Sequence, residues 1–481
     1  MVDASEPAEQ KRPQPEDPDD DAPVVAKRPR QAPAKPIKGL FLDTVNRHML
    51  DFDFEKLCSV SLSNLNVYAC LVCGRYFQGR GKASHAYFHS LHEDHHVFIH
   101  LENLRIYILP DGYEETEASL NDIKYVLKPT FTKEQIQSLD SSERYSYDLN
   151  NKPYLPGFVG LNNIKANDYV NTAIHALAHI KPLRDFFLLG DLPESSELAR
   201  RFGILVRRIW NPRAFKGQVS PHEFLQEMAN SSQKRFTLTK QMDPIDFIVW
   251  FLNTLHTDLG GKKSGSKSIV HNTFQGQLRI ETQEIVASED NSQAKVFDLN
   301  REIKVSHVPF MFLTLDLPPP PLFQDEIEKN IIPQVPLSML IQKYDGVAGQ
   351  EQGKTLRRFK ITKLPQFLIF HIKRFTKNNW DLEKNPTIVT FPIRNVDMSE
   401  CYEGDTGVET RYDLVANICH EGKPGSGSGT YKVHVYCKGK DQWFQIQDLI
   451  VEEIMPQMIF LSESYIQVWG RREPEGEDMS H

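Results

Sequence analysis

The sequence predicts an α+β protein made of a small first module and a larger second one, and two observations lead to this class. A segment within residues 58–100 concentrates cysteine and histidine, the composition of a small metal-bound fold. Farther along, apolar residues first recur at helical spacing and then alternate, so helices and strands occupy separate stretches. The expected helices are residues 173–189, 194–211, 220–230 and 241–252, and the expected strands are residues 270–280, 309–317 and 367–375.

Length and composition limit the possible classes. With 481 residues the chain exceeds one ordinary domain, and its 40% apolar content suffices for packed cores. The net charge of −8 implies no strong field for nucleic acid or a membrane surface. No apolar run approaches the ~20 residues that span a bilayer, and no secretory signal opens the chain. Six cysteines in so long a chain are not a disulfide framework, so we expect a soluble intracellular protein with no membrane partner.

Residues 1–39 are predicted to be a disordered tail. They contain no aromatic residue, eight prolines and an acidic run at residues 17–21, and such a segment buries too little apolar surface to offset its ordering entropy. Two basic clusters lie within it, at residues 11–12 and 27–30. Paired basic clusters in a flexible tail suit a nuclear-import receptor, although short basic runs also arise by chance. We therefore predict a nuclear protein.

The first folded module, residues 40–130, contains a candidate metal site. Cys70 and Cys73 form a Cys-x-x-Cys pair, and His89 and His95 follow at a workable spacing. Two thiolates and two imidazoles complete a tetrahedral zinc site with no position left for water, so the zinc would be structural. The substitutes within this segment are Cys58, His85 and His96. The competing interpretation is a set of buried thiols and solvent-facing histidines.

A connecting segment, residues 131–155, leads to the second module, residues 156–470, and residues 471–481 form a polar tail. Within the connection we expect a helix with Thr132 as its N-cap. The second module opens with Gly-Leu-Asn-Asn-Ile-Lys-Ala-Asn-Asp-Tyr-Val-Asn-Thr at residues 160–172, which runs directly into an apolar helical pattern. A helix N-terminus of this kind favours a thiolate or another anion. Here the first-turn residue is Asp168, and the simplest interpretation is that Asn167 or Asp168 caps the helix.

This stretch resembles the cysteine box of the ubiquitin-specific proteases, whose pattern is Gly-Leu-x-Asn-Leu-Gly-Asn-Thr-Cys-Tyr-Met-Asn-Ser. Asp168 falls at the position of the family's nucleophilic cysteine, and Asn163 at that of its oxyanion-hole asparagine. The family's histidine box resembles residues 412–431, with Thr430 at the general-base position. The orienting acid is replaced by Gln447, although the neighbouring Asp448 is retained. The resemblance implies a papain-like fold of thumb, palm and fingers with all three catalytic positions substituted.

The first module resembles the zinc-finger domain that accompanies many of these proteases. Members that bind the free tail of ubiquitin use an aromatic residue, an arginine and a later tyrosine, and the matching positions are Tyr68, Arg75 and Tyr107. Tyr68 stands where tryptophan is usual. Many relatives also hold a zinc ion in the fingers, but no cysteine lies between Cys73 and Cys401, so no zinc is expected there.

Three functions compete: a non-catalytic scaffold, an atypical ubiquitin hydrolase and a ubiquitin reader acting through the zinc finger. A carboxylate attacks an amide poorly, and loss of a whole triad leaves only binding and oxyanion stabilisation. His434 lies too far along its predicted strand to replace the missing base, at about 13 Å. The substituted triad, the zinc finger and residues 374–379 resemble the branch of the family that acts in pre-mRNA splicing. That resemblance implies spliceosomal tri-snRNP proteins as partners, and it leaves weak ubiquitin binding and direct RNA contact open.

Overall fold

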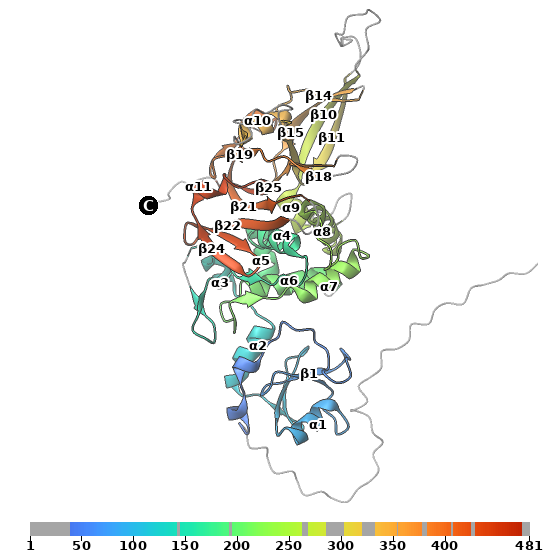
Figure 1. Cartoon of the computed structure of the whole chain (residues 1–481), viewed down its shortest axis with the longest axis vertical. Coiled ribbons are helices and arrows are strands. Elements are labelled where there is room, and N and C mark those ends of the chain that lie inside the picture. The colour runs from blue at the N-terminus through green and yellow to red at the C-terminus, as the bar shows by residue number, and fades with distance from the viewer. Residues whose placement is uncertain are drawn as a thin grey trace, which may run out of the picture. The chain divides into compact units, whose positions relative to one another are not determined.

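The computed structural model describes residues 39–141, 145–191, 195–261, 268–284, 303–319, 332–353, 355–377, 382–405, 407–424 and 429–473. The chain divides into two compact units, and the division falls at residue 123, with residues 53–55 belonging to the second unit (Figure 1). Both basic clusters of the N-terminal tail, nearly all of that tail, the Gly- and Ser-containing residues 262–267 and 425–428, and residues 474–481 lie outside the described residues. Every helix in the described part of the chain is too short or too polar to cross a membrane.

The first unit is an antiparallel sheet that carries one helix. The sheet order is β2-β1-β3-β4-β5, and α1 follows β2 along the chain. Ser84 caps α1 by accepting a hydrogen bond from the N–H of Tyr87, and every residue of β1, β3 and β4 is buried. The bounds are β1 (Val67–Cys70), β2 (Tyr76–Gln78), α1 (His85–His92), β3 (Val97–His100), β4 (Ile106–Ile108), β5 (Tyr113–Glu115) and α2 (Asn121–Leu127), the last of which contains the division between the units.

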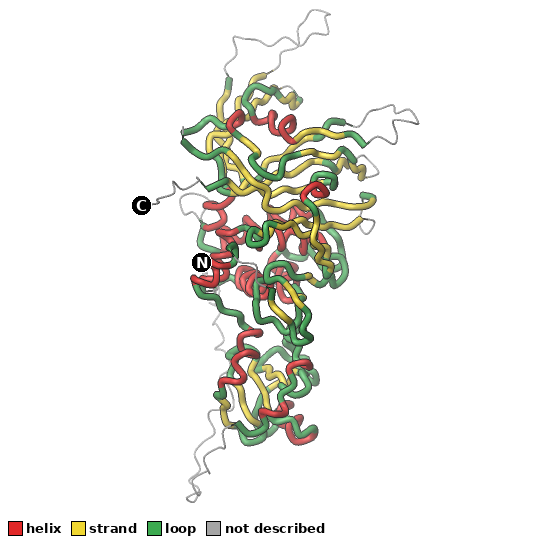
Figure 2. The backbone as a smooth tube through the Cα atoms, turned by 90° about the vertical axis from the view of Figure 1, so that its left-hand side faces the viewer, coloured by secondary structure: helices red, strands yellow, loops and turns green. Residues whose placement is uncertain are grey.

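Helices lead the second unit, as the sequence predicts, and they gather beside its strands (Figure 2). Thr132 caps α3 in a capping box with Gln135, which confirms the expected cap, although the helix is shorter than predicted. The helix expected over residues 173–189 is two helices, because Pro182 has no N–H to donate to the preceding turn. The bounds are α3 (Lys133–Ser138), α4 (Asp168–Ala178), α5 (Lys181–Leu189), α6 (Glu197–Ile209), α7 (His222–Ser231), α8 (Pro244–Asp258), α9 (Ile269–Phe274), α10 (Leu337–Ile341) and α11 (Pro456–Ile459).

An eight-stranded sheet forms the centre of the second unit, in the order β12-β16-β25-β21-β22-β23-β24 with β20 paired to β21. A four-stranded sheet, β11-β10-β15-β14, lies beyond it. The prediction of a strand over residues 270–280 is wrong for its first half, because those residues belong to α9, which precedes β10. The bounds are β6 (Ser146–Tyr147), β7 (Pro153–Tyr154), β8 (Gly160–Leu161), β9 (Gln218–Val219), β10 (Gly276–Glu284), β11 (Lys304–Phe310), β12 (Leu313–Asp316), β13 (Gln334–Pro336), β14 (Gln350–Gln352), β15 (Thr355–Lys363), β16 (Phe367–Lys373), β17 (Phe375–Lys377), β18 (Leu382–Lys384), β19 (Ile388–Thr390), β20 (Val396–Asp397), β21 (Arg411–Gly422), β22 (Gly429–Cys437), β23 (Gln442–Gln447), β24 (Ile450–Ile454) and β25 (Ser464–Arg471).

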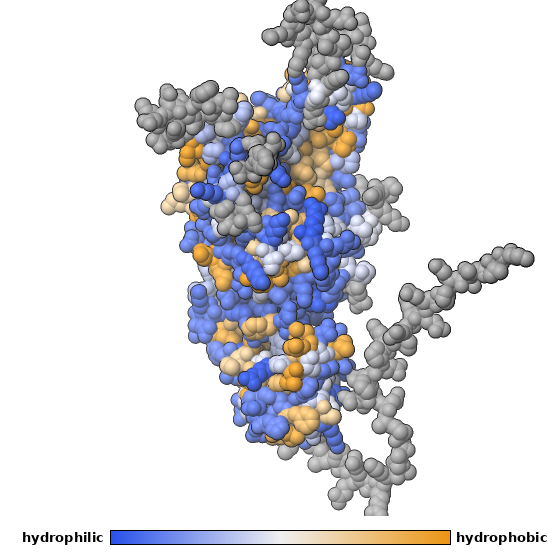
Figure 3. Space-filling model, turned by 45° about the vertical axis from the view of Figure 1, so that its right-hand side comes forward, coloured by the Kyte–Doolittle hydropathy of each residue, from blue (hydrophilic) through white to orange (hydrophobic). Residues whose placement is uncertain are grey.

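Two cores lie on the two faces of the central sheet. On one face α4 is buried along its whole length against β22 and β21, with Val433 and Val435 beneath it. On the other face Trp469, Tyr412 and Trp443 form a second core. The surface of the second unit drawn in Figure 3 is mostly hydrophilic, with apolar side chains in small groups. The first residue of α4 is therefore fixed between a helical layer and a sheet, and this position decides the chemistry of the site.

Candidate functional site

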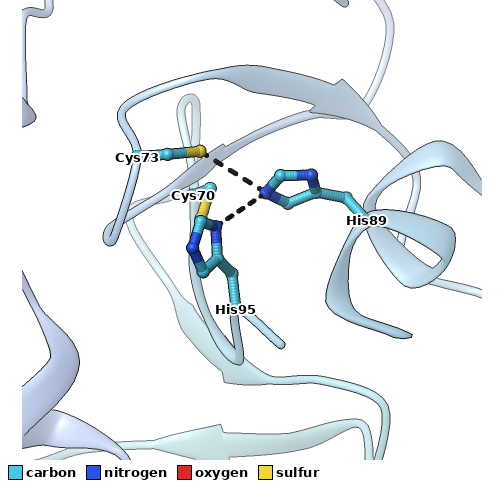
Figure 4. A group of neighbouring side chains, drawn as sticks. All are labelled: Cys70, Cys73, His89 and His95. Atoms are coloured by element: carbon cyan, nitrogen blue, oxygen red, sulfur yellow. Dashed lines mark hydrogen bonds between the residues drawn. The ribbon is translucent and has the colours of Figure 1, made fainter. Parts of the chain in front are cut away.

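Four side chains of the first unit converge on one point. Cys70 ends β1, Cys73 lies in the turn that follows, His89 projects from α1 and His95 precedes β3 (Figure 4). Their sulfur and nitrogen atoms all lie within 4.8 Å of one another. The distance from Cys73 Sγ to His89 Nε2 is 3.4 Å, and that from His89 Nε2 to His95 Nδ1 is 3.0 Å. The structure thus brings together the four residues that the spacing singled out.

A tight backbone turn presents the two cysteines. The N–H of Gly74 donates to Cys70 O and the N–H of Cys70 donates to Arg75 O, both at 2.9 Å. Gly74 has a φ of +74°, and a Cβ on it would lie 2.1 Å from Met49 O, so only glycine fits this turn. The hydrogen bond with Cys70, together with the nearby histidines, lowers the pKa of Cys73 despite its burial. A thiolate is the form of cysteine that ligates metal.

None of the three substitute ligands belongs to the cluster. Cys58 Sγ accepts a hydrogen bond from the N–H of Ser61 at 3.4 Å. The ring of His96 contacts Leu109 O at 2.7 Å and Asp94 Oδ1 at 2.8 Å. His85 is the first residue of α1 and is not part of the cluster.

The positions that correspond to ubiquitin-tail contacts are partly covered. Tyr68 and Tyr107 are buried, with their ring centroids 6.0 Å apart at an angle of 70°. Arg75 is exposed, and the guanidinium of Arg80 lies 4.6 Å from the centre of the Tyr107 ring. The two tyrosines are therefore packed against their neighbours.

In the second unit Asp168 is the first residue of α4, but its side chain does not cap that helix. Its Oδ2 accepts hydrogen bonds from Gln241 Nε2 at 2.7 Å and from the N–H of Tyr431 at 3.0 Å. Gln241 Nε2 also donates to Gly429 O at 3.0 Å, so one carboxylate and one amide tie the start of α4 to β22. Asn167 does occupy the N-cap position of α4, as one interpretation expected, but its Oδ1 accepts from the N–H of Ile164 and makes no capping hydrogen bond to the helix.

Burial governs the charge of Asp168, which is 4% exposed. Desolvation raises the pKa of this carboxyl, the hydrogen bonds from Tyr431 and Gln241 oppose that rise, and the charge of Asp448 adds to it. The second oxygen, Oδ1, is buried and has no hydrogen-bond partner in the described part of the chain. The Asp168 carboxyl therefore acts as a buried hydrogen-bond acceptor within the fold.

The retained asparagine position is also occupied by internal contacts. Asn163 Nδ2 donates to Asp448 Oδ2 at 3.0 Å, and Asn171 Nδ2 donates to Asp448 Oδ1 at 3.2 Å. Asn163 Oδ1 accepts from the N–H of Asn167 at 3.2 Å, and Asp448 O accepts from the N–H of Leu161 at 2.9 Å. One N–H and the carbonyl oxygen of the Asn163 side chain are therefore engaged within the protein.

The two remaining substituted positions meet at the surface. Gln447 Nε2 donates to Thr430 Oγ1 at 3.4 Å, and Thr430 is exposed. His434 is fully buried, and its ring contacts the side chains of Asn417 and Gln445. Within the described residues, Asp168 is hydrogen-bonded to a side-chain amide and to a backbone N–H. Neither of these groups accepts a proton as a general base does.

Sequence reasoning missed two members of this arrangement. Gln241 was assigned to the start of a helix, but α8 begins at Pro244 with Asp243 as its cap, which leaves the Gln241 side chain to reach Asp168. Pro244 is the sequence signal for this later start of the helix, because proline favours the first turn of a helix. The contribution of the Tyr431 backbone has no sequence signal, because any residue carries the same N–H.

Comparison with known proteins identifies both units. Residues 159–469 match the family model described as ubiquitin carboxyl-terminal hydrolase, and residues 58–120 match the zinc finger of ubiquitin hydrolases and other proteins. The chain belongs to the ubiquitin carboxyl-terminal hydrolase family. The predicted fold class, a zinc finger of this type followed by the protease fold, is confirmed.

Several similar relatives within this family are named for splicing. The probable mRNA-splicing protein ubp10 of Schizosaccharomyces pombe is 50% identical over 93% of this chain and 92% of its own length. Ubiquitin carboxyl-terminal hydrolase 39 of Homo sapiens is 52% identical over 90% of this chain and 80% of its own length. A solved structure described as an essential yeast splicing factor is 31% identical, with a TM-score of 0.74, and covers 90% of this chain and 100% of that one. The predicted resemblance to the splicing branch is confirmed.

Proposed function

We propose that this chain is a non-catalytic scaffold in pre-mRNA splicing, built on a protease fold that no longer catalyses peptide hydrolysis. The observation that carries the proposal is the double hydrogen bond from Gln241 and Tyr431 to Asp168 at the position of the nucleophile. The names of the relatives indicate the process, which is pre-mRNA splicing. The hydrogen bonds to Asp168 give the reason why no substrate is turned over.

Peptide hydrolysis needs a nucleophile, a general base and an oxyanion donor, and each of these positions is altered or partly engaged in this site. The nucleophile position holds a buried carboxylate, which attacks amides poorly. The base position holds Thr430, which takes no proton near neutral pH, and the oxyanion position Asn163 already donates to Asp448. Cys419 and Cys437 do not substitute, because both are buried in the sheet and burial raises the pKa of each thiol.

The partners we propose are proteins of the spliceosomal tri-snRNP, with the folded surface serving as the docking platform. Depletion of the protein from nuclear extract should reduce the tri-snRNP content of spliceosomes on native gels, and added recombinant protein should restore it. Undiminished assembly after depletion would refute the splicing role. A fluorogenic ubiquitin substrate tests the alternative hydrolase, and calorimetry with free ubiquitin tests the alternative reader. Turnover by the wild-type chain would refute the non-catalytic proposal.

For the first unit we propose one structural zinc held by Cys70, Cys73, His89 and His95. Tetrahedral zinc with these donors places ligand atoms roughly 3.3–3.8 Å apart. The cluster already has contacts of 3.4 and 3.0 Å, and all four ligand atoms lie within 4.8 Å of one another. Bound zinc would cross-link β1 to α1, supplying folding free energy and no reaction. We propose domain limits of 40–130 for this finger and 156–470 for the protease-like domain.

We propose a nuclear protein whose import depends on the basic residues 27–30. These residues lie in a segment of low apolar content, so their replacement by alanine should leave the fold intact. The expected result is loss of nuclear accumulation of a fluorescent fusion. The matched control replaces residues 11–12, and nuclear accumulation of the 27–30 variant would assign import to another signal or to a bound partner.

A further inference from the structure

The outer edge of β24 is an unpaired strand edge. In the central sheet β24 pairs with β23 in the antiparallel register Gln445↔Glu452, and no other described strand pairs with it. The side chains of Ile450, Glu452 and Glu453 are all exposed to solvent. Such an edge presents a row of backbone N–H and C=O groups that suits another strand.

Apolar side chains lie at both ends of this edge. Leu449 and Ile450 mark its beginning, and Ile450 is 57% exposed. At the other end Met455 is 71% exposed, and Met458 and Leu461 follow it on and after α11. Single exposed apolar residues are ordinary, but groups at both ends of one open strand indicate a binding surface.

The charge of Glu452, in the middle of β24, indicates what kind of partner this edge binds. Ile450, Glu452 and Ile454 share one face because side chains alternate along a strand. Glu453, on the other face, pairs with Lys440, whereas Glu452 has no ion pair in the described part of the chain. A second copy pairing antiparallel through its own β24 would bring two Glu452 carboxylates together, which opposes self-association.

We infer that β24 binds an extended segment of a partner protein by strand addition. The segment carries a lysine or arginine opposite Glu452 and apolar residues on either side of it, on the same face. Its backbone pairs with the free edge, its charge meets Glu452, and its flanking side chains cover Ile450 and the methionines at Met455 and Met458. Ile450 and Ile454 are separated by about 13 Å at strand rise, so some seven residues of partner suffice. This inference does not rest on the splicing role.

The test uses a fluorescein-labelled synthetic peptide, Thr-Val-Thr-Lys-Thr-Val-Thr, and the full chain, with anisotropy as the readout. The matched peptide has glutamate in place of lysine, and a third peptide is N-methylated at alternate amides. We expect the lysine peptide to bind at least about fivefold more tightly than the glutamate peptide, and we expect E452K to reverse that order. N-methylation should abolish binding, because it removes the backbone donors.

The control variant is Glu383→Lys, which makes the same charge change on β18, and it should bind both peptides as the wild type does. Circular dichroism of each variant checks that the fold is kept. Equal binding of the lysine and glutamate peptides, no binding up to about 1 mM, or an E452K variant that behaves like the wild type would each overturn the inference. Sedimentation showing a wild-type dimer that E452K dissociates would assign the edge to a second copy and overturn it as well.

Discussion

Replacing Asp168 and Gln241 singly and together tests the conclusion that the nucleophile position has become a structural link. Gln241 Nε2 donates to Asp168 Oδ2 at 2.7 Å, inside a region where Asp168 is 4% exposed. A hydrogen bond to a charged group contributes about 1.5–3 kcal/mol to stability. The double-mutant cycle of Asp168→Ala and Gln241→Ala should therefore give a coupling free energy of about 1.5–3 kcal/mol.

Single-variant values mix several effects, and the cycle separates them. Asp168→Ala leaves the N–H of Tyr431 without its acceptor, but it also removes a carboxylate whose pKa burial raises, and these terms oppose each other. Gln241→Ala also removes the bond to Gly429 O. Each of these terms is present in a single variant and in the double variant, so it cancels from the coupling.

Urea unfolding followed by tryptophan fluorescence is the appropriate assay. All five tryptophans lie after residue 123, so the signal reports on the second unit alone. The control cycle combines Asp168→Ala with Gln447→Ala, whose side chain bonds to Thr430 and not to Asp168, and it should be additive within about 0.5 kcal/mol. A coupling below about 0.5 kcal/mol between Asp168 and Gln241 would refute the link.

Three further outcomes are expected. Cys73→Ser, or chelation of the metal, should unfold the first unit, and a purified chain without zinc by metal analysis, or a variant that melts like the parent, contradicts the proposed site. Asp168→Cys alone should stay inactive on ubiquitin amides, because no imidazole takes the thiol proton; adding Thr430→His and Gln447→Asp should give weak cleavage if the path to the site is open. Burial lowers the pKa of His434 to about 4, so the folded chain holds the neutral ring. The stability that His434 contributes is therefore fully present above about pH 6.5 and falls as the pH drops below that value. Between pH 7 and pH 5 this one residue should cost about 2 kcal/mol, and unfolding of His434→Gln at both pH values should show a correspondingly smaller loss; an unchanged loss contradicts the assignment.

The sequence by itself determined the features that depend on neighbours along the chain. The cluster in the first unit follows from local spacing, since a Cys-x-x-Cys turn and one short helix bring Cys70, Cys73, His89 and His95 together. The capping box at Thr132 is local as well. The surrounding motif likewise marks Asp168 as the position that corresponds to the family's nucleophile, and this assignment stays a prediction. Errors arose where two local signals compete, as at Pro182, which ends an apolar helical pattern that otherwise continues.

Only the tertiary structure decided what Asp168 does. Its partners lie 73 residues away at Gln241 and 263 residues away at Tyr431, and the second of these is a backbone group that carries no sequence signature. The same holds for Asn163, whose amide is engaged by Asp448 across 285 residues. The sequence shows which residue occupies a catalytic position. The hydrogen-bond partners of that residue depend on the strands and loops that pack against it in the folded protein. The open edge of β24 follows the same rule, because sheet order determines which strand is left unpaired.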